Sequence, residues 1–67
     1  MEVSPRLTDR EIEILRLVSR GLSNQEIARH ASITVGTTKG HLHRIFQKLN
    51  ARSRTGAVAN ARELGML

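Results

Sequence analysis

The chain has 67 residues, no cysteine and a formal net charge of +5 at pH 7, and this length suffices for one small domain. The lack of cysteine excludes a disulfide framework and a thiolate metal site, and it suits a reducing cytoplasm, where we expect the protein. No apolar run approaches the roughly 20 residues needed to cross a membrane, and the first ten residues lack the apolar segment of a signal peptide.

Helical periodicity of apolar residues occurs four times, and no segment shows the alternation expected of strands. The predicted fold class is therefore all-α, a compact four-helix domain that contains a helix-turn-helix. Residues 1–6 are expected to form a flexible lead-in, and residues 7–67 the folded domain.

The first two helices are predicted over about residues 9–20 and 24–31. Thr8 and Ser23 each precede a helix as its N-cap, and a glutamate three residues later completes a capping box in both cases. Gly21 tolerates the left-handed backbone conformation that ends the first helix.

The third helix is predicted over about residues 35–49, after Thr34 as its N-cap. Its inward stripe consists of Val35, Thr38, Leu42, Ile45, Phe46 and Leu49. The fourth helix is predicted over about residues 53–64, and Gly65 ends it. Ala57, Val58, Ala61 and Leu64 share one face of this helix.

The whole net charge of +5 lies in the second half of the chain. Residues 1–33 hold five basic and five acidic residues, whereas residues 34–67 hold six basic residues and one acidic residue. This asymmetry favours a polyanion, either nucleic acid or an anionic membrane surface, over a merely soluble basic surface. Because Phe46 is the single aromatic residue, binding to single strands by base stacking is disfavoured.

The second and third predicted helices, joined by a short turn, form a helix-turn-helix pattern. In that motif the second helix lies in the major groove of DNA, and the first crosses the backbone. Lys39 and His43, one turn apart on the outward side of the third helix, can donate to acceptors on guanine or to phosphate. Gly40 lies between them, and a glycine there either permits close approach to a base edge or is tolerated because packing supports the helix.

Phosphate contacts are expected on the flanks of this helix. Arg44 and Lys48 suit such contacts, although each is equally compatible with an ordinary solvated face. Ser23, Asn24 and Gln25 begin the second helix, where free amides attract phosphate alongside simple capping. Arg54 precedes the fourth helix, with an internal ion pair to Glu11 or Glu13 as its alternative.

We expect no metal site, no cofactor and no enzymatic activity. His41 and His43 are two residues apart, so they point to different helix faces and cannot chelate one ion. The acidic residues are sparse, and Ser, His and Asp show no arrangement typical of a nucleophile.

Three stretches, "LTDREIEILRLVSRGLSNQEIA" at 7–28, "ITVGTTKGHLHRIFQKL" at 33–49 and "RSRTGAVANA" at 52–61, resemble the C-terminal DNA-binding domain of LuxR-type transcriptional regulators. The resemblance implies a response-regulator-like effector domain whose third helix enters the major groove. Lys39, Gly40 and His43 then correspond to base-reading positions. Thr37, the start of the second helix and the basic residues after Leu42 correspond to backbone contacts.

The resemblance also implies dimers through the fourth helix and an N-terminal sensing domain. Three residues depart from the family pattern. Thr38 brings a hydroxyl near the core, where it can bond back to the Thr34 carbonyl. Gly40 offers no side chain to read a base, and Gly56 should weaken the start of the fourth helix.

We therefore predict sequence-specific binding to double-stranded DNA by a transcription regulator, without contact to a membrane. The alternative is a helical protein-interaction module, for example one that contacts RNA polymerase or another regulator. RNA binding is a third and weaker hypothesis.

Overall fold

The computed structural model of the chain describes residues 6–67 and contains four helices and no strand within that range. The predicted all-α fold class is confirmed. The helices are α1 (Asp9–Ser19), α2 (Asn24–Ala31), α3 (Val35–Lys48) and α4 (Arg54–Glu63). Each helix begins and ends within one residue of its predicted position. Where the predicted and observed ends differ, the residue concerned is an N-cap or C-cap residue, which can be assigned either way. Of the predicted lead-in, only Arg6 belongs to the described residues.

The helix starts follow the predicted capping chemistry. Thr8 Oγ1 accepts from the Glu11 amide at 3.1 Å, and the Glu11 carboxylate accepts from the Thr8 amide at 2.9 Å. Ser23 and Glu26 form the same reciprocal pair at the start of α2. At α3, Thr34 Oγ1 accepts from the Thr37 amide at 3.0 Å. These bonds satisfy amides that the first helical turn leaves without a partner.

The end of α2 depends on backbone conformation. Ser32 ends the helix through its own left-handed backbone, with φ of 59°, and its amide donates to the carbonyls of Ala28 and Arg29. Serine here performs the role that glycine performs at Gly21, where φ is 83°.

The core lies where α1, α2, α3 and α4 meet. The largest fully buried side chains are Ile14, Leu15, Ile27, Ile45 and Thr38. The predicted inward stripe of α3 is confirmed in its buried members, whereas Val35 and Phe46 at its edges are only half-buried. The Thr38 hydroxyl donates to the Thr34 carbonyl at 3.0 Å, as predicted.

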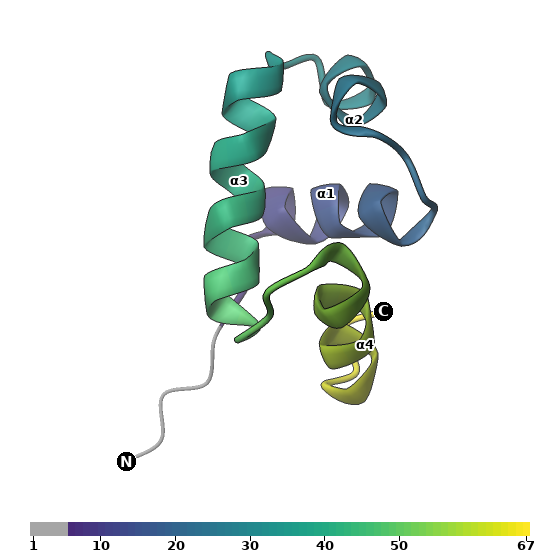
Figure 1. Ribbon diagram of the computed structural model, residues 1–67, viewed down its shortest axis with the longest axis vertical. Helices are drawn as coiled ribbons and strands as arrows, with labels where there is room; N and C mark the ends of the chain where they lie inside the picture. The colour runs from purple at the N-terminus through teal and green to yellow at the C-terminus, as the bar shows by residue number, and fades with distance from the viewer. Residues whose placement is uncertain (1–5) are drawn as a thin grey trace.

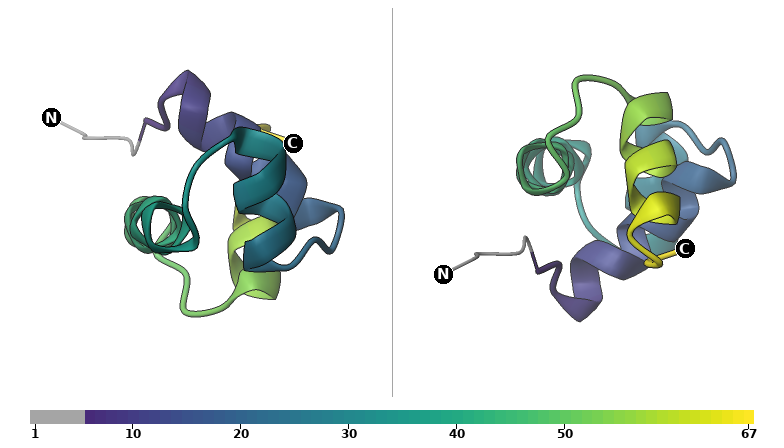
Figure 2. Two further views of the ribbon diagram at one scale, coloured as in Figure 1. Left: turned by 90° about the horizontal axis from the view of Figure 1, so that it is seen from above. Right: turned by 90° about the horizontal axis from the view of Figure 1, so that it is seen from below.

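Among residues 6–67, the arrangement leaves one side of α3 uncovered. Figure 1 shows α3 as a long rod along one side of the molecule, with α2 near its start, α1 crossing it and α4 near its end. Seen end-on in Figure 2, α3 stands to one side of the group formed by the other helices. Because its neighbours all lie on one side, the opposite side of α3 is available to a partner.

Candidate nucleic-acid interface

The outward side of α3 carries the residues predicted to read bases. Lys39, Gly40 and His43 are all exposed, while Thr38 and Leu42 on the opposite side of the same turns are buried. Neither Lys39 nor His43 has a hydrogen bond or ion pair to any residue in the described part of the chain. Both side chains therefore keep their donors for a partner.

A shallow depression joins this side of α3 to the starts of α2 and α4. It is lined by Asn24, Lys39, Leu42, His43, Phe46 and Arg54. Leu42 and Phe46 contribute an apolar part, and the other four residues contribute polar or cationic groups. The structure thus gathers four of the predicted contact residues, from three helices, around one surface. Leu42 and Phe46 were predicted to lie in the core alone, and their contribution to the lining of this depression was not predicted.

The flanking residues divide into free and engaged groups. Arg44 is exposed and unpaired within residues 6–67. Thr37 is exposed, and its hydroxyl accepts from Thr34 Oγ1 at 3.0 Å, so its own proton remains available to a phosphate. Gln25 is exposed at the start of α2, and the Ser23 hydroxyl accepts from the Glu26 amide as a cap, so its proton, like that of Thr37, remains available.

Lys48 is engaged within the fold. Its ammonium lies 2.8 Å from a carboxylate oxygen of Glu11 and 3.2 Å from the Arg6 carbonyl oxygen. Burial raises the pKa of the Glu11 carboxyl, but the hydrogen bonds from Lys48 and Thr8 outweigh burial and bring this pKa below its usual range. The assignment of Lys48 to a phosphate stays a prediction, and such a contact would compete with this ion pair.

The alternative partner considered for Arg54 is wrong. Arg54 pairs with neither Glu11, which holds Lys48, nor Glu13, which lies 3.2 Å from Arg10. Its Nη2 instead donates to Asn24 Oδ1 at the start of α2. Two residues predicted as separate phosphate contacts are therefore joined to each other.

One structural residue was missed altogether. Asn60 on α4 donates from Nδ2 to the Leu49 carbonyl at 2.8 Å and so fixes α4 against the end of α3. Its position next to the inward residues Ala57 and Ala61 was the signal available in the sequence, because a polar residue beside an apolar stripe often bonds to backbone.

Comparison with known proteins identifies the group to which this arrangement belongs. The model of a family described as bacterial regulatory proteins, luxR family, matches residues 5–61. The solved structure of the transcription factor GerE is similar with a TM-score of 0.84 and 34% identity, over 91% of either chain. The chain belongs to the luxR family of bacterial regulatory proteins. Its helix-turn-helix is a DNA-binding unit that serves transcription regulation.

Other luxR-type relatives are longer than this chain. The response regulator protein VraR of Staphylococcus aureus is 48% identical over 60 residues, which cover 90% of this chain and 29% of VraR. The response regulator ChrA of a heme-sensing two-component system matches with a TM-score of 0.90 and 40% identity, over 92% of this chain and 31% of ChrA. The chain thus spans less than a third of these two relatives.

The histidines of this luxR-type domain do not gather around a common point. Within residues 6–67, no group of three His, Cys, Asp or Glu side chains lies close enough to hold a metal ion. His41 is half-buried, and its Nδ1 lacks a hydrogen-bond partner in the described part. None of the helices in that part combines the length and apolar character needed to cross a membrane.

Proposed function

We propose that this domain binds double-stranded DNA sequence-specifically, with α3 in the major groove. The observation that carries the proposal is the two-sided character of α3. Its inner side is fixed by the buried residues Thr38, Leu42 and Ile45, and its outer side presents Lys39 and His43. Side chains on a rigid helix reach base edges with defined geometry, whereas side chains on a mobile loop do not.

In this proposal, base recognition rests on few groups. Lys39 and His43 donate to acceptor atoms of bases, most favourably guanine O6 and N7. Gly40 lies between them and has no side chain, so the helix backbone can approach a base edge or a thymine methyl group. A Cβ atom at Gly40 would meet no atom of the protein within 4 Å, so internal packing does not require the glycine.

Affinity comes mainly from the DNA backbone. Arg44 and Thr37 flank the reading side of α3, and the start of α2 offers Asn24 and Gln25. Helix amides and side-chain donors of this kind hold phosphates and set the register of the protein on the duplex. We include Ser23, Lys48 and Arg54 in this group; for Lys48 and Arg54, the internal bonds described above compete for the side-chain donors.

Selection of bound sequences from a random duplex pool tests the proposal. We expect enrichment of a short motif, and binding that weakens by about a thousandfold or more between 50 and 200 mM salt if six or more phosphates are contacted. Binding without enrichment would contradict sequence-specific reading. No duplex binding at low salt would favour the protein-interaction alternative, with RNA polymerase or another regulator as partner. Preference for RNA in a competition assay would favour the third hypothesis.

We also propose that the domain works in the cytoplasm and acts by binding rather than by catalysis. Two copies bind paired half-sites on DNA and contact each other through α4. Leu64 at the end of α4 and Leu67 beyond it are the exposed large apolar side chains of residues 6–67, and they offer apolar surface for a contact between copies. Sedimentation with DNA carrying one or two half-sites tests this. We expect cooperative occupancy of the double site, and independent occupancy would contradict it.

A further inference from the structure

A hydrogen bond between two side chains joins the starts of α2 and α4. Nη2 of Arg54, the first residue of α4, donates to Oδ1 of Asn24, the first residue of α2. A guanidinium group has donors only, so the Asn24 amide must turn its oxygen toward Arg54. The NH₂ group of Asn24 lies in the same amide plane on the other side of the Cβ–Cγ bond, and it therefore points away from the contact with Arg54.

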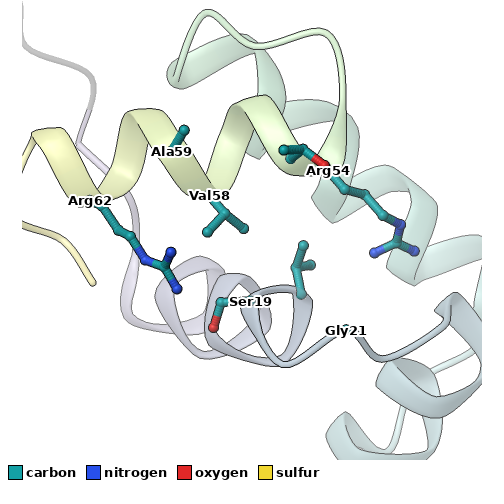
Figure 3. A pocket seen from close by; sticks show the side chains of 8 residues that line it. Ser19, Gly21, Arg54, Val58, Ala59 and Arg62 are labelled. Carbon is teal, nitrogen blue, oxygen red and sulfur yellow. The ribbon is translucent and has the colours of Figure 1, made fainter.

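Arg54 is built into the fold more deeply than Arg44. Its Nη1 is buried and has no hydrogen-bond partner among residues 6–67, and the residue as a whole is half-buried. Its side chain also lines a groove between α1 and α4, together with Val18 and Val58. Figure 3 shows Arg54 extending away from Val58 and Ala59. Burying part of a cation costs free energy. The partly buried position of Arg54 therefore indicates a structural role for its guanidinium group.

Asn24 and Arg54 both line the depression that Lys39 and His43 also line. The amide that Arg54 orients is therefore part of the surface proposed to meet DNA. A side chain fixed in its bound orientation binds more tightly, because less rotational freedom is lost on association.

We propose that Arg54 is a positioning residue for DNA binding: it holds the Asn24 amide so that the NH₂ group of Asn24 faces a DNA phosphate beside α3. This inference rests on the proposed function and revises one part of it, since Arg54 then acts through Asn24 and makes no separate phosphate contact. It also makes the start of α4 a determinant of how α2 meets the DNA backbone.

A double-mutant cycle on DNA affinity tests the proposal. The dissociation constant of a selected duplex is measured for the wild-type domain, Asn24→Ala, Arg54→Met and the double variant. Each single change is expected to weaken binding about three- to tenfold, as the loss of one hydrogen bond does. The double variant should be no weaker than the weaker single variant. Effects that multiply would overturn the proposal, because they would mean two independent contacts.

Arg52→Met is the matched control, because Arg52 is an exposed arginine two residues earlier. Its effect should multiply with that of Asn24→Ala, whatever its size. Arg54→Lys keeps the charge but shortens the side chain and removes the planar fork. We expect Arg54→Lys to bind as weakly as Arg54→Met, and recovery of wild-type affinity in Arg54→Lys would contradict positioning.

The free energy of unfolding of each variant separates positioning from a loss of folded protein, and binding is measured where all variants are folded. If Arg54→Met does not fold, the cycle is run with Arg54→Lys, and the same comparison decides. Failure of the wild-type domain to bind duplex DNA would refute the proposed function. Wild-type binding with multiplying effects would refute only the role of Arg54.

Discussion

The ammonium group of Lys48, at the end of α3, lies 2.8 Å from a carboxylate oxygen of Glu11 in the first turn of α1. The Glu11 side chain is only 5% exposed and also accepts from the Thr8 amide. One carboxylate thus completes the cap of α1 and holds the end of α3. A buried carboxylate of this kind stabilises a fold only while its donors remain in place.

We expect Glu11→Gln to lower the free energy of unfolding by about 1–3 kcal/mol at neutral pH, because it removes charge-assisted hydrogen bonds. The folded-state pKa of Glu11 lies below its ordinary value of 4.5. The stabilisation is therefore present above that value and is lost as pH falls through the folded-state pKa. Denaturant unfolding from pH 7 to pH 3 should show wild type and variant converging. A difference that stays constant with pH would contradict this.

Thr38→Val should change stability by less than about 1 kcal/mol, although Thr38 is fully buried. Its hydroxyl donates to the Thr34 carbonyl, which also accepts from the Thr38 amide, so no backbone acceptor is left unpaired in the variant. Valine has nearly the same shape and adds apolar burial. Thermal unfolding measures the effect. A loss of unfolding free energy above about 2 kcal/mol would mean that the Thr38 hydroxyl stabilises the fold by more than its own hydrogen bond to the Thr34 carbonyl.

Gly40→Ala should raise the free energy of unfolding by about 0.5–1 kcal/mol and weaken binding to a selected duplex. The new Cβ would meet no protein atom, so only the helix propensity changes within the protein. On DNA, the methyl group would stand between α3 and the base edges. Stabilisation with unchanged affinity would show that the glycine has no part in recognition.

Gly56→Ala is the matched control for this comparison. A Cβ at Gly56 would lie 3.2 Å from Ser53 Oγ, the cap atom that accepts from the Gly56 amide at 3.0 Å. Gain in helix propensity and disturbance of the cap, each about 1 kcal/mol, should therefore nearly cancel. Gly56 was expected only to weaken the start of α4. Its lack of a Cβ atom also leaves space for the capping hydroxyl of Ser53.

Arg44→Ala should lower the slope of log affinity against log salt by about 0.9, as expected for one lost phosphate contact. Selected and random duplexes should be affected alike, since phosphate contacts carry no sequence information. Fluorescence anisotropy over a salt series measures both quantities. An unchanged slope would remove Arg44 from the set of phosphate contacts.

The sequence predicted local features well because their causes are local. The capping pairs at Thr8 and Ser23 span three residues, and the burial of the α3 stripe follows from helical periodicity alone. Contacts between helices were not predictable in the same way. Lys48 and Glu11 are 37 residues apart, and Arg54 and Asn24 are 30 apart. Periodicity tells which side of a helix is inward, but it does not tell which neighbouring helix a long side chain will reach.

For the candidate site, the sequence identified the exposed residues of α3 but not the state of their neighbours. Lys39 and Arg44 were expected to be free, and they are unpaired within the described residues. Lys48 lies on the same helix, and nothing in the sequence pattern distinguishes it from Lys39 and Arg44. Its ammonium group nevertheless pairs with a residue of α1, Glu11. Only the packing of α3 on α1 distinguishes these cations.

The most direct test compares Lys39→Ala with the wild-type domain on two duplexes, one selected by the protein and one random. If α3 reads bases through Lys39, the variant should lose about 1–3 kcal/mol of discrimination, that is, most of its loss should appear on the selected duplex. Equal weakening on both duplexes would contradict base reading by Lys39 and, with it, the proposed placement of α3 in the major groove.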